Sequence, residues 1–320
     1  MKQLRAGLVG LGMMGRHHLR VLSQLDGVDL IGVYDPLLNP LEPVNGIPSF
    51  NNLEDLVALK PDYCVVAAPT AFHLELGLTL ADAGINALIE KPLATDSKEA
   101  MQLVAAFDKA GLIGGVGHIE RFNPAIQMMR QKIEEGLIGN VYQIATRRQG
   151  PFPSRISDVG VIKDLATHDI DLTSWVAQRT YESITAHTAF RSGRVHEDMV
   201  IAIGKLEGGI IVNHMVNWLT PFKERNTTVI GEHGALVADT LTADLTYFAN
   251  AVSNSSWENI SAFRGVSEGD VIRFALNKYE PLKAEHEAFR DAVNGLSKEE
   301  IVSFSQGLNV LITADKMIGV

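Results

Sequence analysis

Two different patterns of hydrophobic and polar positions divide the chain. In the first part, short continuous apolar runs alternate with stretches in which apolar residues recur every three or four positions. The runs are typical of strands buried on both faces and the spaced stretches of amphipathic helices, so the alternation predicts a doubly wound parallel sheet with helices on both sides. Strands are expected around Leu8–Val9 and at 28–35, 62–70, 85–89 and 112–117, helices after Gly15 and at 51–59, 72–83 and 96–110, and a loop at 36–48.

From Val141 onward, apolar and polar residues alternate instead. Alternating strands joined by short turns such as Glu207–Gly209 predict an antiparallel sheet. Its strands are expected at 141–147, 181–190, 199–206, 210–218, 227–230 and 235–238. Helices are expected from Asn123-Pro124 to Gly136 and at 164–172, 281–293 and 298–318, whereas the polar stretch 250–268 predicts no element. The change of pattern predicts two domains, 1–120 and 121–320, with a C-terminal helix that can pack back on the first.

A glycine-rich turn follows the first expected strand. Gly10, Gly12 and Gly15 form a G-x-G-x-x-G motif, with Met13 and Met14 inside it. In a dinucleotide site the first glycine allows a sharp turn, the second lets the backbone approach a pyrophosphate, and the third lets the helix pack close to the strand. The free N–H groups and positive dipole end of that helix then face the phosphates.

An acidic residue closes the next expected strand. Asp35 lies 20 residues past Gly15, where a carboxylate can accept hydrogen bonds from both ribose hydroxyl groups. Pro36 and Leu37 follow, and neither can hold a 2′-phosphate. The sequence therefore predicts NAD rather than NADP as cofactor.

Ligands of doubly wound sheets bind beyond the carboxyl ends of the strands. Pro69-Thr70 and Glu90-Lys91-Pro92 follow two of the expected strands, so we expect them at the same edge as the glycine loop. A partly desolvated lysine there can exchange a proton with a substrate hydroxyl group. The alternative is that Glu90 and Lys91 form a solvated surface pair.

A second candidate lies on the helix expected at 164–172. Asp164 and His168 are four positions apart and share a face, so the carboxylate can orient a histidine that acts as acid or base. The alternative makes Asp164 an N-cap and His168 a structural histidine. A metal site would need a third ligand from Asp171 or His118, but the spacing matches no known metal motif, so no metal is predicted.

Three arginines flank the proline-containing stretch 150–153. Arg147, Arg148 and Arg155 can clamp a diphosphate or a carboxylate, or can form a solvated basic edge. His17 and His18, on the helix after the glycine loop, are expected at the helix surface or in packing rather than in chemistry.

Composition narrows the class of protein. The chain has 320 residues and a net charge of −10, which argues against binding to nucleic acid or to an anionic membrane. The single cysteine, Cys64, lies in an apolar strand pattern and is expected to be a buried hydrophobe in a reducing compartment. With neither a signal-peptide pattern nor an apolar run of membrane-spanning length, the protein is expected in the cytoplasm.

Taken together, these motifs resemble those of the Gfo/Idh/MocA oxidoreductases. The resemblance rests on Gly-Leu-Gly-Met-Met-Gly, on Ala-Pro-Thr at 68–70 with His73, on Glu90-Lys91-Pro92 and on Asp164 with His168. It implies a Rossmann domain, an α+β domain with an open, mostly antiparallel sheet, and a homodimer or homotetramer. It also implies hydride transfer between nicotinamide and a sugar or polyol carbon, with Lys91, Asp164 and His168 as catalytic residues. The cofactor neighbours it implies are Pro69, Thr70, His73 and Glu90.

Three further stretches, 117–124, 147–156 and 158–161, look like the branch of the family that oxidises nucleotide-activated N-acetylglucosamine at C3. This branch implies a nucleotide-sugar substrate, with His118, Arg121, Arg148 and Arg155 as its candidate ligands. The alternatives are an inositol or free-sugar dehydrogenase and a non-catalytic NAD(H)-binding regulator. One departure is that many members have two glycines before the catalytic helix, whereas the stretch 159–163 has only Gly160.

Overall fold

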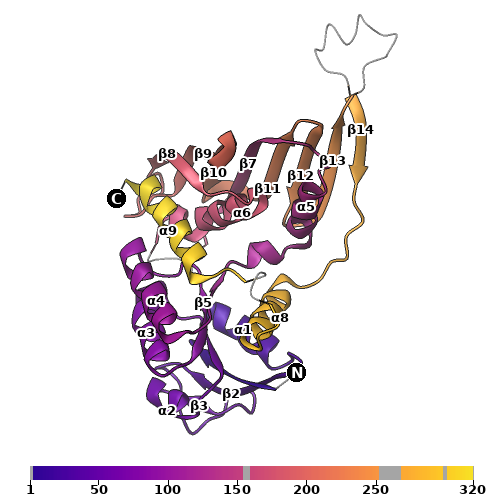
Figure 1. Cartoon of the computed structure of the whole chain (residues 1–320). Helices are drawn as coiled ribbons and strands as arrows, with labels where there is room; N and C mark the ends of the chain where they lie inside the picture. Colours follow the sequence, from indigo (N-terminus) through magenta and orange to yellow (C-terminus); the bar gives the residue numbers. More distant parts are fainter. Residues whose placement is uncertain (1–2, 154–158, 252–267, 298–300, 320) are drawn as a thin grey trace, which may run out of the picture. The chain divides into compact units, whose positions relative to one another are not determined.

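The computed structural model describes residues 3–153, 159–251, 268–297 and 301–319 (Figure 1). It divides into two compact units, which are described separately. Unit 1 comprises Met1–Ile119 and Glu280–Asp315, and unit 2 comprises Glu120–Tyr279 and Lys316–Val320. The chain thus leaves unit 1 near residue 120 and returns to it near residue 280.

Unit 1 is built on a six-stranded parallel sheet in the order β3-β2-β1-β4-β5-β6. Its strands are β1 Leu4–Val9, β2 Val28–Tyr34, β3 Ser49–Phe50, β4 Tyr63–Val66, β5 Asn86–Glu90 and β6 Gly114–Gly117. The predicted parallel sheet is confirmed. The two-residue strand β3, which follows the irregular stretch 36–48, was not predicted because it is too short to show a pattern.

Helix α4 of unit 1 begins and ends at capping residues that the sequence shows. The carboxylate of Asp96 accepts from the N–H groups of Lys98 and Glu99 at 2.9 Å, and Gly111 ends the same helix with a φ of 66°. The helices are α1 Met13–Leu22, α2 Leu53–Ala58, α3 His73–Asp82, α4 Ser97–Ala110, α8 Pro281–Val293 and α9 Phe304–Ile318. The helix predicted at 281–293 is confirmed, whereas α9 begins at 304; residues 298–300 lie outside the described residues.

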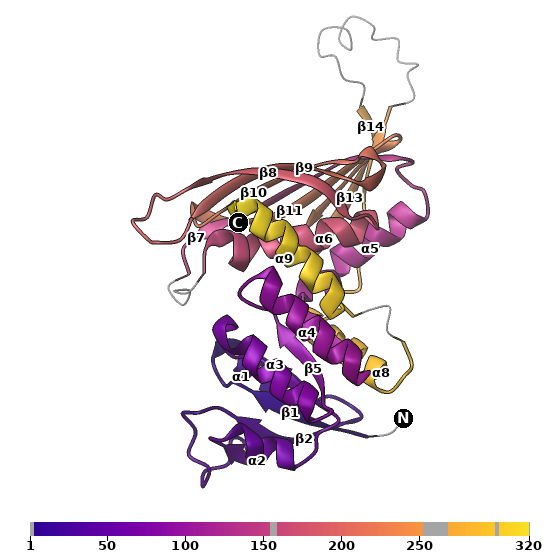
Figure 2. The same ribbon diagram turned by 60° about the vertical axis from the view of Figure 1, so that its left-hand side comes forward.

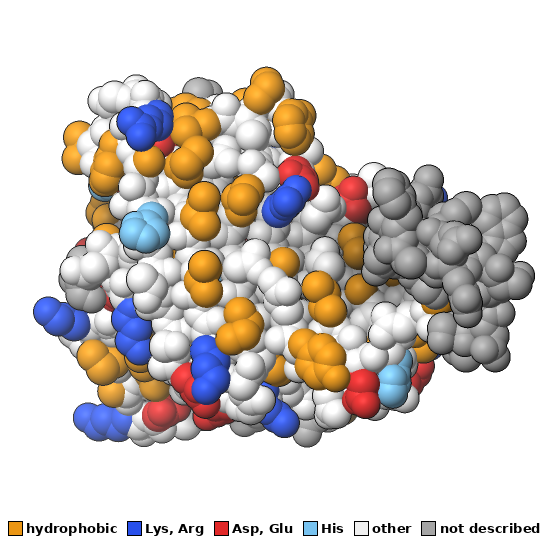
Figure 3. All heavy atoms as spheres, turned by 90° about the horizontal axis from the view of Figure 1, so that it is seen from above, with side chains coloured by type: hydrophobic (Ala, Val, Ile, Leu, Met, Phe, Trp, Pro, Cys, Tyr) orange, Lys and Arg blue, Asp and Glu red, His pale blue; other side chains and the backbone are white. Residues whose placement is uncertain are grey.

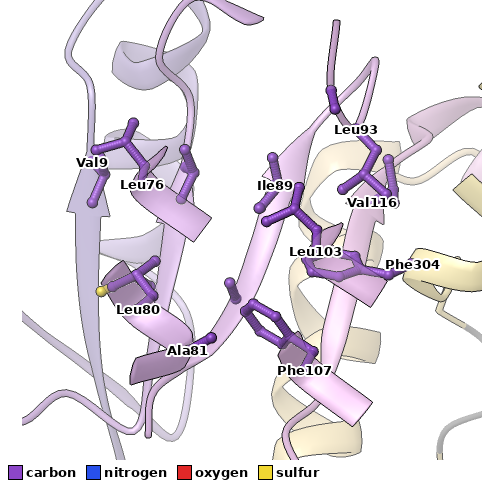
Figure 4. Close-up of a cluster of buried hydrophobic side chains, with 14 of the residues drawn as sticks. Val9, Leu76, Leu80, Ala81, Ile89, Leu93, Leu103, Phe107, Val116 and Phe304 are labelled. Atoms are coloured by element: carbon purple, nitrogen blue, oxygen red, sulfur yellow. The ribbon is translucent and has the colours of Figure 1, made fainter. Parts of the chain in front are cut away.

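The main core of unit 1 lies between one face of the sheet and helices α2, α3, α4 and α9. Figure 4 shows Val9 and Ile89 from the strands facing leucines of α3 and α4. The rings of Phe107 and Phe304 pack edge to face with centroids 4.7 Å apart, which joins the C-terminal segment to α4. On the other face, α8 packs against α1, and Phe289 contacts Tyr63 with ring centroids 5.4 Å apart.

Cys64 on β4 is fully buried, as predicted. Burial raises the pKa of its thiol to about 12, so the thiol stays protonated and unreactive at neutral pH. This residue therefore packs as a small hydrophobe.

Unit 2 is built on an eight-stranded sheet in the order β14-β13-β12-β11-β7-β10-β9-β8. Its strands are β7 Val141–Pro151, β8 Tyr181–Ala189, β9 Met199–Leu206, β10 Ile211–Asn217, β11 Leu219–Gly231, β12 Gly234–Asp239, β13 Asp244–Asn250 and β14 Glu268–Arg273. Neighbouring strands are antiparallel except β7 and β10, which are parallel. The predicted sheet is confirmed, although β13 and β14 were not predicted and β7 and β11 are longer than expected.

Helices α5 Pro124–Glu134 and α6 Thr167–Ala177 cover one face of this sheet (Figures 1 and 2). Asn123 caps α5 by accepting from the N–H group of Ala125 at 3.0 Å, and Gly136 follows its end with a φ of 78°. Apolar side chains from both helices and from the covered face of the strands form the core of the unit.

Among the described residues, no helix covers the opposite face of the sheet. Figure 3 shows this face, with hydrophobic side chains spread over it among uncharged groups and some charged side chains. Strand alternation places exposed apolar side chains there, namely Ile201, Ile203, Ile211, Ile230, Phe248 and Val271. In the part of the chain that the structure describes, none of the helices is long and apolar enough to cross a membrane.

Candidate active site

The glycine loop of unit 1 has the geometry of a phosphate cradle. Gly10 has a φ of 92°, and a Cβ atom there would lie 2.8 Å from the backbone of Ala67. A Cβ atom at Gly15 would overlap the carbonyl oxygen of Gly10, whereas one at Gly12 would meet nothing within 4 Å. Helix α1 has no side-chain cap and no acidic residue in its first turn, so its N–H groups stay available to an anion.

Asp35 is fixed beside this loop. Its carboxylate accepts from the N–H group of Leu11 at 2.9 Å and from that of Leu37 at 3.0 Å. Each carboxylate oxygen keeps a second lone pair, which a ribose hydroxyl group can use. The glycine loop, the open helix end and this carboxylate therefore fit NAD.

His73 ties together the two loops that follow β4 and β5. The ring is 1% exposed, with Nδ1 3.0 Å from the carbonyl oxygen of Pro92 and Nε2 2.9 Å from that of Ala68. Burial lowers the pKa of His73 although both carbonyl groups oppose this shift. The structure thus brings the loop of Pro69 and Thr70 next to that of Lys91, as expected for neighbouring strands of a parallel sheet.

Glu90 does not form a solvated surface pair with Lys91. Its side chain is 12% exposed, and Oε1 lies 2.9 Å from Nε2 of His18. Its other oxygen, Oε2, accepts from the backbone N–H group of Lys91 at 3.1 Å. Burial alone would raise the pKa of Glu90, but the hydrogen bond and charge of His18, with the charge of Lys91, lower it below its ordinary value.

In unit 2, the segment that carries Asp164 is a π-helix, Ile162–Ala166, which continues into α6. Asp164 is 3% exposed and lies inside this segment, so it is not an N-cap. A π-turn holds one residue more than an α-turn and is frequent at functional sites. His168 follows in the first turn of α6 and is half-buried.

Glu197 holds the start of the π-helix, a role that the sequence did not reveal. Its carboxylate oxygen Oε1 accepts from the N–H group of Ile162 at 3.0 Å, and its backbone carbonyl accepts from that of Val161 at 3.0 Å. A Cβ atom at Gly160 would overlap this carboxylate. The single glycine before this helix therefore stands where the carboxylate leaves no room for a side chain.

Two of the arginines expected to bind substrate form ion pairs inside unit 2. Nε of Arg148 lies 2.8 Å from Asp169 and Nη1 lies 2.9 Å from Glu120, and the side chain is 4% exposed. Burial alone would lower the pKa of Arg148, but the two carboxylates raise it above its ordinary value. Arg121 binds Asp171 through two nitrogens, one of them 2.8 Å from the carboxylate.

The remaining candidates are placed as follows. His118 is 1% exposed at the end of β6 in unit 1, and Arg147 is 61% exposed on β7 in unit 2. Arg155 lies outside the described residues. Among the described residues, no group of three or more His, Cys, Asp or Glu is arranged to hold a metal ion.

Comparison with known proteins defines the class first. The NAD-binding Rossmann domain of an oxidoreductase family matches residues 4–118, where the glycine loop and Asp35 lie. The chain thus contains the NAD-binding domain of an oxidoreductase. A Gfo/Idh/MocA C-terminal domain matches residues 126–237, and with both domains present the chain belongs to the Gfo/Idh/MocA family.

The chain is similar in sequence to dehydrogenases of two kinds. It is 32% identical over 176 residues to UDP-N-acetylglucosamine 3-dehydrogenase of Acidithiobacillus ferrooxidans, which is 54% of each chain. It is 27% identical over 229 residues to inositol 2-dehydrogenase of Corynebacterium glutamicum (strain R), which is 68% of this chain and 67% of that protein. The matched part thus spans about half of the first relative and two thirds of the second.

Solved structures match over nearly the whole chain. UDP-N-acetylglucosamine 3-dehydrogenase GnnA from Acidithiobacillus ferrooxidans has a TM-score of 0.86 and 25% identity, with 99% of this chain and 97% of that chain covered. The WlbA dehydrogenase from Bordetella pertussis, solved with NADH and UDP-GlcNAcA, has a TM-score of 0.81 and 23% identity, with 98% and 94% covered. The second match shows a shared fold.

Proposed function

We propose that this protein is an NAD-dependent dehydrogenase that oxidises a secondary hydroxyl group of a sugar. We further propose that its substrate is UDP-N-acetylglucosamine or a related nucleotide sugar, oxidised at C3. The observation that carries the proposal is the Glu90-Lys91-Pro92 turn at the edge that also holds the NAD cradle, in a chain whose second unit presents Asp164 and His168. The similarity to UDP-N-acetylglucosamine 3-dehydrogenase supports the choice of substrate.

In this proposal, each residue has one task. Bound NAD supplies the acceptor for the hydride that leaves the sugar carbon. The N–H groups at the start of α1 hold the pyrophosphate and Asp35 holds the ribose. His168 takes the proton of the reacting hydroxyl group, Asp164 orients His168, and Lys91 donates a hydrogen bond to the reacting oxygen.

The buried ion pairs change the expected substrate contacts. Arg148 and Arg121 are each paired with carboxylates inside unit 2, so we propose that they hold α6 in place and do not bind the diphosphate. Arg155 and His118 stay as the candidate substrate residues. The nucleotide-sugar hypothesis then predicts that Arg155→Ala weakens substrate binding.

The test is NADH formation, followed by absorbance, with NAD and a panel of UDP-N-acetylglucosamine, free N-acetylglucosamine, free glucose and inositols. Turnover with the nucleotide sugar alone supports the proposal. Turnover with free polyols only would support the proposed dehydrogenase reaction but would reject the nucleotide sugar as substrate in favour of a free sugar or an inositol. If no substrate of the panel gives NADH, the assay is repeated with 2-oxo acids as hydride acceptors, which would release tightly held NADH. No turnover in this second assay would favour the non-catalytic regulator.

We also propose that a second copy of the chain covers the open sheet face of unit 2, which gives the homodimer or homotetramer expected for the family. The exposed apolar side chains on this face support it, since a face of this kind is seldom left in water. Ile203→Lys on this face should lower the mass measured by light scattering, while Val195→Lys, on a loop side chain that is 90% exposed, should not. An unchanged mass in both variants would place the interface elsewhere.

A further inference from the structure

A chain of three buried titratable side chains lies directly behind Lys91 in unit 1. His18 on α1 is 0% exposed; its Nε2 is 2.9 Å from Oε1 of Glu90 and its Nδ1 is 2.8 Å from Nε2 of His286. His286 is on α8 and is also 0% exposed. These three side chains thus connect α1, the end of β5 and α8, and α8 follows β5 by nearly two hundred residues in the sequence.

This row of hydrogen bonds ends on the backbone N–H group of Lys91. The two oxygens of Glu90 have different donors, since Oε1 faces His18 and Oε2 accepts from the N–H group of Lys91. A Cβ atom at Gly117 would lie 3.2 Å from Oε2, so β6 passes close to the carboxylate and limits its rotation. If His18 were absent, one oxygen of this carboxylate would lack its donor, and the hydrogen bond of the other oxygen to the Lys91 backbone would lose its support.

The hydrogen-bond directions follow from the charge of Glu90. Its pKa is lowered, so the carboxylate is ionised at neutral pH and accepts a hydrogen bond from the N–H group at Nε2 of His18. Burial and the charge of His18 lower the pKa of His286 well below its ordinary value, so its ring is neutral and carries one proton. Nε2 of His286 and Nδ1 of His18 share one hydrogen bond of 2.8 Å, which holds the His18 ring with its Nε2 toward Glu90.

We propose that His18 is a positioning residue for Lys91 that acts through Glu90, with His286 holding the ring of His18 in place. The proposal rests on the proposed function, in which Lys91 contacts the reacting oxygen. The sequence alone assigned His18 to packing or the helix surface; its full burial and its two hydrogen bonds correct the surface assignment.

The main experiment compares His18→Leu with the matched control His17→Leu, an exposed histidine on the same helix. His18→Leu should lower kcat about 10- to 100-fold, because a small misplacement of a catalytic group has effects of this size. KM and NADH affinity should change less than about twofold, since the phosphate cradle keeps its own contacts. His18→Gln keeps an N–H donor for Glu90 and should recover most of kcat. Equal kcat in the His17 and His18 variants would overturn the proposal.

A double variant tests whether His18 acts through Glu90. If it does, His18→Leu combined with Glu90→Gln should lose no more kcat than Glu90→Gln alone, because both changes remove the same support. Fully additive losses would overturn the proposal, since His18 would then act by another route.

One readout is independent of any substrate. Amide hydrogen exchange at Lys91 should accelerate in His18→Leu and stay slow in His17→Leu, because only the first change frees the N–H group from Glu90. If the wild-type protein turns over no sugar, the proposed function fails while this measurement still decides the inference. Unchanged exchange in a folded His18→Leu protein would overturn it.

Discussion

The two units hold their chemically active side chains in different ways. In unit 1, most groups of the candidate site are fixed by backbone atoms. The contacts are those of Asp35 with the N–H groups of Leu11 and Leu37, of Glu90 with the N–H group of Lys91, and of His73 with the carbonyl groups of Ala68 and Pro92. The buried pair of His18 and His286 is the exception, and it supports the same turn from behind.

In unit 2, buried side chains mainly bind other side chains, many of them far apart in the sequence. The contacts are those of Arg148 with Asp169 and Glu120, of Arg121 with Asp171, and of His214 with Thr146 and Tyr181. From this difference we expect substitutions at the unit 1 site to change mainly turnover, and substitutions in the unit 2 ion pairs to change mainly stability. A functional side chain on a backbone-held turn can be removed at little cost in stability, whereas a buried ion pair cannot lose one partner without leaving a charge uncompensated.

The largest expected effect is on turnover, in unit 1. Lys91→Met removes the ammonium group but keeps the N–H group that binds Glu90, so the turn and the NAD cradle should persist. We expect kcat to fall about 10²- to 10⁴-fold, the usual range for a group that assists proton transfer. NADH binding, followed by fluorescence, should change less than about twofold. Lys98→Met, on an exposed position of α4, serves as control. Equal loss of turnover and NADH binding would show that Lys91 shapes the cradle instead.

The next largest effect is on stability, in unit 2. Arg148→Met leaves the buried Asp169 and the partly buried Glu120 without their partner, so the free energy of unfolding should fall by about 3–5 kcal/mol. Arg147→Met alters the neighbouring residue, which is 61% exposed and 3.7 Å from Glu224. This variant should change the free energy of unfolding by less than about 0.5 kcal/mol. Urea unfolding measures both. Similar small effects in the two variants would mean that the buried pair adds nothing to the fold.

This contrast also explains how much could be predicted from the sequence. Motifs in unit 1 are local, because a glycine turn, a strand-end acid and a strand-end lysine each lie within a few residues of what fixes them. The parallel sheet, the cap of α4 and the start of α8 at Pro281 were therefore predicted correctly. In unit 2, a clear alternation predicted β9 over its full length.

Long-range contacts had no signal in the sequence. Nothing local marks Asp169 as the partner of Arg148, Glu197 as the support of Ile162, or His286 as the neighbour of His18. The π-helix was taken for ordinary helix because one extra residue in a turn leaves the apolar pattern unchanged. The loop arginines were expected to face a substrate because sequence shows the charge of a guanidinium group but not the carboxylates that surround it.

A smaller effect is expected at the start of the π-helix, where the Glu197 carboxylate accepts from the N–H group of Ile162. Gly160→Ala would place a methyl group against the buried carboxylate of Glu197, so we expect a loss of about 1–3 kcal/mol and a fall in kcat as the π-helix shifts. Gly150→Ala is the control, since a Cβ atom there would make an ordinary contact of 3.5 Å with Lys223. Thermal unfolding compares the two. If Gly160→Ala is as stable as Gly150→Ala, the Glu197 contact does not hold the helix.

The smallest effect at neutral pH comes from the side-chain network of unit 2, which makes stability depend on pH only in acid. Burial lowers the pKa of His214 to about 4 from its ordinary 6.5, although the charge of Asp169 opposes the shift. Between these values the unfolded chain binds a proton that the folded chain does not, so stability falls as the pH falls from about 6.5 to about 4, by up to about 1.4 kcal/mol per pH unit. Above pH 6.5 the contribution is constant.

His214→Gln cannot titrate, so its slope of unfolding free energy against pH should be shallower by about that amount, measured by urea unfolding at several pH values. His73 and His286 are also buried and have lowered pKa values, so the unfolding free energy of the variant should still depend on pH to some extent. Thr146→Val is the matched control: it removes a hydroxyl group that lies 2.7 Å from Nδ1 of His214 and should lower stability while the slope persists. An unchanged slope in His214→Gln would show that His214 titrates alike in the folded and unfolded chains, and that unit 2 does not depend on a neutral imidazole at this point.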